Sequence, residues 1–274
     1  MNVSICTISF RHSLQSVEQL AHWSAEHGFD GIELWGAHAR NLHSSPELNG
    51  QWLQSYGLTV PLISDYLPLH QEWESIFPPL KSLITLAERW QTNKLRIFAG
   101  DLGSQQISSD QRNHLVKQLR RACHYALNTG GQILVEIHPR TLCDSIPSTL
   151  QLLGEVNHPA LKINFDVLHT WESGANINRA FTELRPFIEH LHLKNVQNRS
   201  DLDVFLPERV FQASASRKGM TSLFHGAIDY DAFLSEHDLT GLNASLEWFG
   251  AHPFEVLQED NRKLHAYRKE KLYH

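Results

Sequence analysis

Four short apolar runs in the second half of the sequence each carry a carboxylate or an imidazole near their C-terminal end. Three carboxylates with one imidazole favour a hard divalent cation such as Mg²⁺, Mn²⁺ or Co²⁺ over a structural zinc site built from thiolates. Burying three carboxylates together without a cation would be very costly. The predicted metal ligands are Glu136, Asp166, His192 and Glu247.

Two further side chains lie two residues beyond predicted ligands, on the same strand faces. His138 follows Glu136, and Lys194 follows His192, at the period of two that a strand requires. We expect both to reach a bound substrate and assign them catalytic roles, with bracing of a ligand as the alternative for His138. His169 joins this catalytic group, either as a substrate contact or as a brace.

The remaining candidates are assigned to the wall of a substrate site. Arg96 lies within an apolar run, as Lys194 does, and an unpaired cation is rarely buried in such a place. An anionic substrate would explain both cations. For the aromatic candidates, core packing is the alternative interpretation. The predicted substrate-binding residues are Arg96, Tyr66, Glu33, Trp35 and Phe249.

These side chains can meet only if the fold brings the C-terminal ends of several strands together. Short β-rich runs alternate with longer amphipathic ones, as in repeated βα units around a parallel sheet. Gly28, Gly57 and the pair at 130–131 fall where helices should stop. The predicted strands are 3–9, 31–35, 59–65, 94–99, 132–138, 161–167, 189–195 and 243–249, and the predicted helices lie near 16–27, 46–56, 73–91, 110–129, 147–155, 176–185, 229–237 and 253–270.

Eight strands, each followed by a helix, predict an α/β fold, a single-domain (β/α)8 TIM barrel over residues 1–274. In such a barrel alternate strand residues point inward, and the chemistry lies at the C-terminal strand ends, where the candidates above fall. A doubly wound open sheet is the alternative. It needs a glycine-rich phosphate turn after the first strand, and residues 8–12 are not one.

Two segments depart from this alternation of strands and helices. His38 and His43 are five residues apart and share no helix face, so their stretch is predicted to be a loop. The segment 197–228 follows the seventh strand, and loops of about thirty residues inside compact domains are usually functional. We predict that it folds over the barrel mouth or across a subunit interface. Its apolar residues Phe205, Phe211, Met220 and Phe224 would then cover apolar surface.

The composition opposes several classes of function. The 24 Lys and Arg residues against 30 Asp and Glu residues give a net charge of −6, which opposes binding to nucleic acid or to an anionic membrane. No apolar run reaches the roughly 18–20 residues of a membrane-spanning helix. The N-terminus lacks the pattern of a signal peptide and the three cysteines are scattered, so a cytoplasmic protein is expected.

At this point the sequence resembles a known family. The Glu-Ile-His-Pro motif at 136–139 and the ligand set around it resemble the xylose-isomerase-like barrel superfamily. Within it, the sequence is similar to the 3-dehydroshikimate dehydratases of petrobactin-type siderophore biosynthesis. The resembling stretches are CTISFRH (6–12), GIELWGAHARNL (31–42), LISDYL (62–67), RIFAG (96–100), PSTLQLLGEVNHPALKIN (147–164), HTWESGA (169–175), HLHLKNV (190–196) and SLEWFG (245–250).

The resemblance implies conversion of 3-dehydroshikimate to protocatechuate with loss of water, through a metal-stabilised dienolate. It places active-site roles on His138, His169 and Lys194, and metal ligands on the four residues already predicted as ligands. For this substrate, His138 is predicted to remove the C6 proton, with Lys194 as its rival. Arg96, or Lys194, is predicted to hold the substrate carboxylate.

Three other classes of function are alternatives to this reaction. A divalent-metal sugar or inosose isomerase, epimerase or dehydratase of the same superfamily shares the barrel and the ligands, but needs no group for a carboxylate. A nucleic-acid enzyme of the apurinic endonuclease type needs more zinc ligands and a basic face. A non-catalytic binding protein has no use for the metal cluster. The sequence leaves open the ion, the oligomeric state and whether the product feeds a siderophore or a catabolic route.

Overall fold

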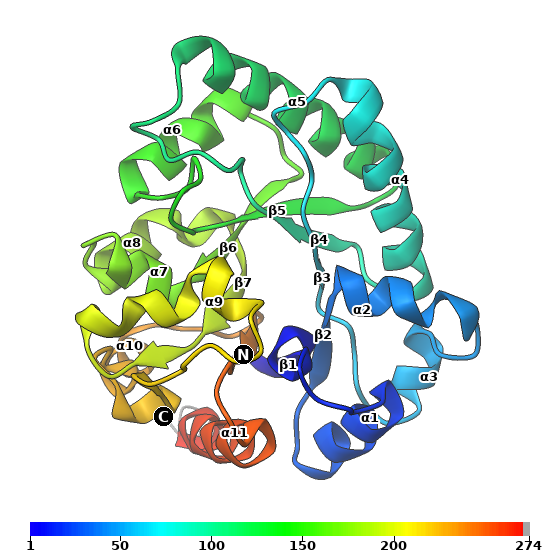
Figure 1. Ribbon diagram of the computed structural model, residues 1–274, viewed down its shortest axis with the longest axis vertical. Helices are drawn as coiled ribbons and strands as arrows, with labels where there is room; N and C mark the ends of the chain where they lie inside the picture. Colours follow the sequence, from blue (N-terminus) through cyan, green and yellow to red (C-terminus); the bar gives the residue numbers. More distant parts are fainter. Residues whose placement is uncertain (271–274) are drawn as a thin grey trace.

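Eight parallel strands close into a barrel, which confirms the predicted fold class. The structure is a computed structural model that describes residues 1–270 (Figure 1). Neighbouring barrel strands pair in the order β1-β10-β7-β6-β5-β4-β3-β2, so the last strand closes onto the first. The strands are β1 (Asn2–Cys6), β2 (Gly31–Trp35), β3 (Ile63–Ser64), β4 (Lys94–Ile97), β5 (Gln132–Glu136), β6 (Leu161–Asp166), β7 (Ile188–Leu193) and β10 (Asn243–Leu246).

The helices surround the barrel and cover the outer faces of its strands (Figure 1). Two of them begin at capping boxes, in which Ser16 pairs with Gln19 and Ser108 pairs with Gln111. The helices are α1 (Val17–Glu26), α2 (Gly36–Asn41), α3 (Gly50–Gln54), α4 (Trp73–Arg89), α5 (Ser109–Asn128), α6 (Ile146–Val156), α7 (Val167–Glu172), α8 (Ile177–Leu184), α9 (Pro207–Val210), α10 (Tyr230–Glu236) and α11 (Pro253–Glu270).

The stretch predicted as a loop around His38 is helical, which corrects the sequence interpretation. Helix α2 starts at Gly36, directly after β2. A side chain at Gly36 would collide with Asp65, so glycine lets the helix approach the end of β3. Arg40 then forms an ion pair with Asp65 and ties α2 to that strand end. The absence of a shared histidine face therefore did not exclude a helix, because tertiary contacts stabilise it.

The segment 197–228 contains short regular elements. Strand β8 (Asn195–Val196) pairs with β9 (Met220–Thr221) in antiparallel fashion, so the segment leaves the barrel and returns to it. Between them lie a 3-10 helix over Arg199–Phe205 and helix α9. The amide group of Asn195 donates to the carbonyl oxygens of Leu223 and Ile228 and fixes the returning end.

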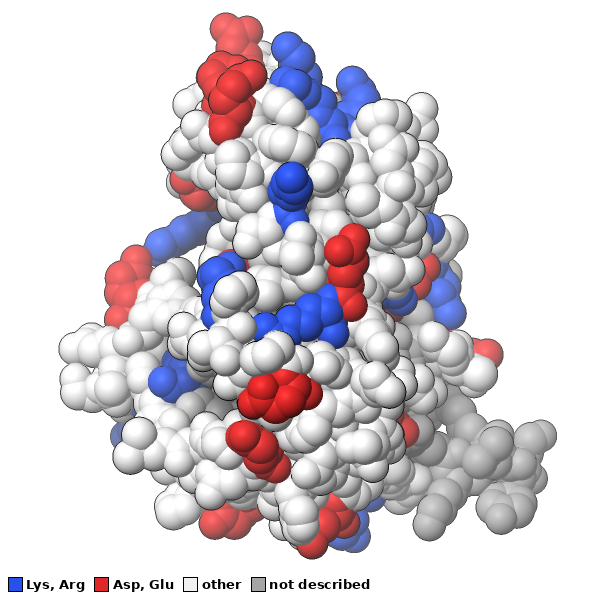
Figure 2. All heavy atoms as spheres, turned by 90° about the vertical axis from the view of Figure 1, so that its right-hand side faces the viewer, with Lys and Arg blue, Asp and Glu red and all other residues white. Residues whose placement is uncertain are grey.

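The surface of the molecule carries charges of both signs. On the face shown in Figure 2, basic and acidic side chains are scattered among uncharged ones. This face is therefore not uniformly basic, as a nucleic-acid-binding face would be. None of the helices in residues 1–270 combines the length and the hydropathy that a bilayer crossing requires.

Candidate active site

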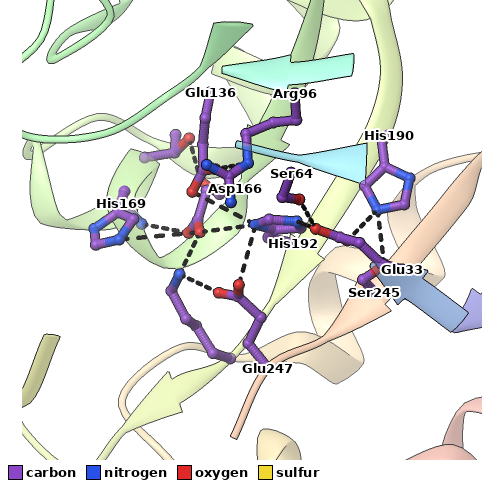
Figure 3. A network of polar contacts seen from close by, with 12 residues as sticks. Glu33, Ser64, Arg96, Glu136, Asp166, His169, His190, His192, Ser245 and Glu247 are labelled. Atoms are coloured by element: carbon purple, nitrogen blue, oxygen red, sulfur yellow. Dashed lines mark hydrogen bonds and ion pairs between the residues drawn. The ribbon is translucent and has the colours of Figure 1, made fainter. Parts of the chain in front are cut away.

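The imidazole of His192 lies at the centre of a buried cluster of carboxylates at the C-terminal end of the barrel (Figure 3). Its Nδ1 atom is 3.5 Å from an oxygen of Glu136, 3.9 Å from Asp166 and 3.6 Å from Glu247. Glu136 and Asp166 end β5 and β6, and Glu247 directly follows β10. The structure therefore brings all four predicted ligands together.

The cluster fits a divalent cation by the chemistry of its atoms. Nδ1 of His192 is buried and has no hydrogen-bond partner. Ligand atoms of Asp166, His192 and Glu247 lie within 4.8 Å of one another. Oxygens of three carboxylates and one imidazole nitrogen form a hard donor set, as Mg²⁺, Mn²⁺ and Co²⁺ prefer.

Lys194 binds two of the clustered carboxylates. Its Nζ atom is 2.6 Å from an oxygen of Asp166 and 2.6 Å from an oxygen of Glu247. Burial alone would lower the pKa of Lys194, but these two carboxylates raise it above its usual value. Lys194 is therefore an ammonium group that partly balances the charge of the cluster.

His138 is held in one tautomer. Its Nδ1 atom lies 2.8 Å from the carbonyl oxygen of Pro139, and a carbonyl only accepts, so Nδ1 carries the hydrogen. The lone pair then remains on Nε2. The ring stacks on Phe98 and packs against His169, with centroids 4.3 and 4.4 Å away. Burial, followed by the neighbouring His169, lowers the pKa of His138 well below its usual value.

His169 lies beside His138 at the start of α7. Its backbone N–H donates to Asp166 Oδ1, the N-cap of that helix, and this bond fixes the position of a predicted ligand. Its Nδ1 atom is 2.6 Å from Glu172. His169 also lines the cavity described next. Its position is therefore compatible with both predicted alternatives, bracing a ligand and contacting the substrate.

A cavity of about 150 Å³ opens above the cluster. Arg96 lies at its wall with Nε 2.9 Å from Glu136, and its guanidinium packs against the rings of Tyr66 and Phe98. Glu136 raises the pKa of Arg96 although burial opposes this. The lining residues are Ile8, Tyr66, Arg96, Phe98, Glu136, His138, His169, Lys194, Phe205, Pro207, Val210, Phe211, Glu247 and Phe249.

Two predicted substrate-binding residues do not line this cavity. Glu33 is fully buried on the far side of His192 from the carboxylate cluster, where its oxygens bind imidazole and hydroxyl groups (Figure 3). Trp35 ends β2, and its ring stacks on Phe211 and contacts His38 of α2. Glu33 does lie on the inward face of its strand, as predicted, but it lies too deep along the barrel axis to line the cavity.

Sequence reasoning missed several contributors to the cavity. Strand alternation places Phe98 on the same inward face as Arg96, but Phe98 was not among the predicted substrate-binding residues. Pro207 and Val210 come from the segment 197–228 and line the cavity together with Phe205 and Phe211. No periodic pattern marks Pro207 or Val210, because the segment's path back to the barrel is set by tertiary contacts.

The chain was compared with known proteins. A sequence model of the xylose isomerase-like TIM barrel family matches residues 21–268. The chain belongs to this family. A 3-dehydroshikimate dehydratase of Bacillus anthracis is 43% identical to it over 272 residues, which cover 96% of each protein. This relationship confirms the resemblance that the sequence motifs indicated, and it extends over the whole barrel.

Solved structures give the same relationship. The crystal structure of AsbF of Bacillus anthracis, described as a probable 3-DHS dehydratase involved in petrobactin synthesis, superposes with a TM-score of 0.92 and 42% identity, covering 96% of this chain and 98% of that one. The IOLI protein with a bound zinc atom has a TM-score of 0.76 at 16% identity, covering 97% and 98% of the two chains. At that identity, the likeness to IOLI shows the fold alone.

Proposed function

We propose that this protein is a metal-dependent dehydratase that converts 3-dehydroshikimate to protocatechuate and water. One observation carries the proposal. This chain is 43% identical to a 3-dehydroshikimate dehydratase, and its cavity is lined by Glu136 and Glu247 of the carboxylate cluster together with His138 and Arg96. A cation site, a neutral imidazole and a guanidinium are the three groups that this reaction calls for.

The substrate determines what the site has to do. 3-Dehydroshikimate has a C3 ketone conjugated through C2=C1, which acidifies the C6 hydrogens. Loss of a C6 proton gives a dienolate with its charge on the C3 oxygen. Departure of the C5 hydroxyl with a proton gives water and a C5=C6 bond. Transfer of the C4 proton to the C3 oxygen then completes the aromatic ring.

The four clustered residues, Glu136, Asp166, His192 and Glu247, would hold the divalent cation. Bound there, it would supply Lewis acidity that stabilises negative charge on the C3 oxygen. Without a cation, the carboxylates are partly balanced by Lys194 and by Arg96. The donor set is compatible with Mn²⁺, Mg²⁺ and Co²⁺ alike.

His138 acts as the base that removes the C6 proton in this proposal. Its Nδ1 hydrogen is committed to Pro139, its Nε2 lone pair is available, and burial keeps the imidazole neutral. Lys194, the rival, is held as an ammonium by two carboxylates, which suits it to donate a proton to the departing hydroxyl.

Arg96 anchors the substrate carboxylate. Its planar guanidinium offers a bidentate fork, and its packing against the rings of Tyr66 and Phe98 at the cavity wall orients that fork. Arg96 already pairs with Glu136 through Nε, but its buried Nη1 has no hydrogen-bond partner. A substrate carboxylate could bind there, whereas the neutral substrate of a sugar or inosose isomerase has no such group.

Incubation of the purified protein with 3-dehydroshikimate tests the proposal. Protocatechuate should accumulate, as followed by absorbance and identified by chromatography. Chelation should abolish the reaction, and Mn²⁺, Mg²⁺ or Co²⁺ should restore it. Shikimate is the matched control, because its C3 alcohol allows no dienolate and it should stay unchanged. Full turnover by metal-free protein would refute the metal dependence, and no protocatechuate in the metal-loaded protein would refute the reaction.

A further inference from the structure

A second buried polar layer lies directly below the carboxylate cluster. The carboxylate of Glu33, in β2, is enclosed there by Ser64, His190 and His192 (Figure 3). The side chains of Glu33, His190 and His192 are all inaccessible to solvent. Glu33 therefore reaches neither the cavity nor the surface, and its direct polar contacts are with these neighbours.

The contact between Glu33 and His192 determines which nitrogen of that ring is free. Nε2 of His192 lies 3.1 and 3.0 Å from the two Glu33 oxygens. A carboxylate oxygen accepts, so Nε2 is the donor and carries the hydrogen. In the neutral ring the lone pair is then on Nδ1, the atom that faces the carboxylate cluster and has no hydrogen-bond partner of its own.

Glu33 is itself held so that it cannot turn away. The hydroxyl of Ser64 donates to one of its oxygens, and Nε2 of His190 lies 3.3 Å from the other. His190 is positioned in turn by Ser245, whose hydroxyl oxygen is 2.9 Å from the same ring nitrogen. Ser64 and His190 therefore fix the orientation of the Glu33 carboxylate, and Glu33 in turn fixes the orientation of the His192 ring.

We propose that Glu33 is a positioning residue that holds His192 in its ligating tautomer and strengthens Nδ1 as a donor to a divalent cation. The inference rests on the cation site of the proposed function. A hydrogen bond from the second nitrogen of a ligating histidine to a carboxylate fixes the ring and raises its basicity. Glu33 thus acts through His192 and does not contact the substrate.

Cation affinity in the absence of substrate tests this role separately from catalysis. The Kd of Mn²⁺ for metal-stripped full-length protein would be measured by titration followed by electron paramagnetic resonance. Glu33→Gln keeps an acceptor but loses the charge, and should weaken binding about 10-fold, whereas Glu33→Ala should weaken it about 100-fold. Ser64→Ala, a milder change, should give a smaller loss in the same direction.

A matched control lies on the same strand as His192. Glu189 is also in β7, but its carboxylate pairs with Lys94 at 2.8 Å. Glu189→Gln should leave the Kd of Mn²⁺ unchanged. The visible absorption of bound Co²⁺ gives a spectroscopic signature: its bands should shift in Glu33→Gln and stay in place in Glu189→Gln, because only the former alters the donor strength of a ligand.

A double-mutant cycle separates positioning from a general structural role. In a His192→Asn background, Glu33→Gln should no longer change the Kd, since its effect passes through the imidazole. A loss that persists in full there, or a folded Glu33→Gln protein with the wild-type Kd, would overturn the inference about Glu33 alone. A wild-type protein that binds no Mn²⁺ would overturn the cation site, and with it this role.

Discussion

The tautomer and the protonation state of the His138 imidazole are set by its neighbours at the C-terminal end of the barrel. Pro139 takes the Nδ1 hydrogen, and burial against Phe98 and His169 disfavours the imidazolium form. The opposite holds for Lys194, which two carboxylates keep protonated. In the proposed mechanism, the neutral imidazole would accept a proton and the ammonium group would donate one.

Replacement of His138 tests the base assignment. His138→Asn should keep the cation and the fold, yet lose about 10²–10⁴-fold in kcat, the usual contribution of a positioned base. The decisive measurement is deuterium uptake from solvent at C6 of 3-dehydroshikimate. Uptake at the wild-type rate in the purified variant would transfer the role of base to Lys194.

Replacement of Arg96 tests the carboxylate anchor. Arg96→Ala should raise KM by the equivalent of roughly 1.5–3 kcal/mol, because a hydrogen bond between charged groups is lost. Arg96→Lys is the matched variant, since it keeps the charge beside Glu136 but loses the bidentate fork, and it should recover only part of the affinity. An Arg96→Ala protein with unchanged KM would place the anchor elsewhere.

At the scale of elements, the segment 197–228 supplies one wall of the cavity. Phe205 packs against His169 and Phe249, and its ring lies 5.6 Å from the ammonium of Lys194. Arg217 fastens the segment by donating to the carbonyl oxygens of Phe249 and Val210. We propose that the segment is a lid, because its aromatic side chain closes the cavity that the strand ends open.

Limited proteolysis tests the lid. Thermolysin should cut within 197–228 more slowly when protocatechuate is bound, since a filled cavity adds contacts to Phe205. Arg217→Ala should accelerate the cut by about tenfold, the effect of losing one or two hydrogen bonds that close the segment. Lys218→Ala, at an exposed neighbouring position, is the control. Equal cleavage rates with and without protocatechuate would contradict the proposed role.

At the scale of the whole molecule, α11 packs against the returning end of that segment. Asp260 accepts hydrogen bonds from the backbone N–H of Leu223 at 3.0 and 3.1 Å, and burial raises its pKa to about 7. An acid whose pKa is raised by folding keeps its proton in the folded state at pH values where the unfolded chain has released it. Its contribution to stability therefore falls as the pH rises from about 4 to about 7.

Asp260→Asn removes this pH dependence. Measured by chemical denaturation, its free energy of unfolding relative to wild type should increase by roughly 1–3 kcal/mol between pH 5 and pH 8, because the wild type alone ionises a buried group. Glu47→Gln, an exposed carboxyl, should follow the wild type at both pH values. A difference between Asp260→Asn and wild type that does not change with pH would contradict the raised pKa.

The sequence was sufficient for the barrel and for the cluster, because both depend on local periodicity. A strand places every second side chain on one face, so Glu136 with His138, and His192 with Lys194, were assigned correctly to inward faces before the fold was known. Closure of eight such strands in a fixed order then brings the C-terminal strand ends to one point. Local alternation and strand order together determine which side chains meet.

The depth of Glu33 in the barrel and the path of the segment 197–228 back to the barrel were decided only by the tertiary structure. Glu33 shares the inward face of its strand, but the pairing of β2 with β1 and β3 sets its depth in the barrel, and at that depth it supports His192 and does not line the cavity. The course of 197–228 likewise follows from Asn195, Arg217 and Asp260, which bind backbone groups far away in sequence. Such contacts leave no periodic trace in the sequence, because each depends on one side chain that meets a distant segment only in the closed barrel.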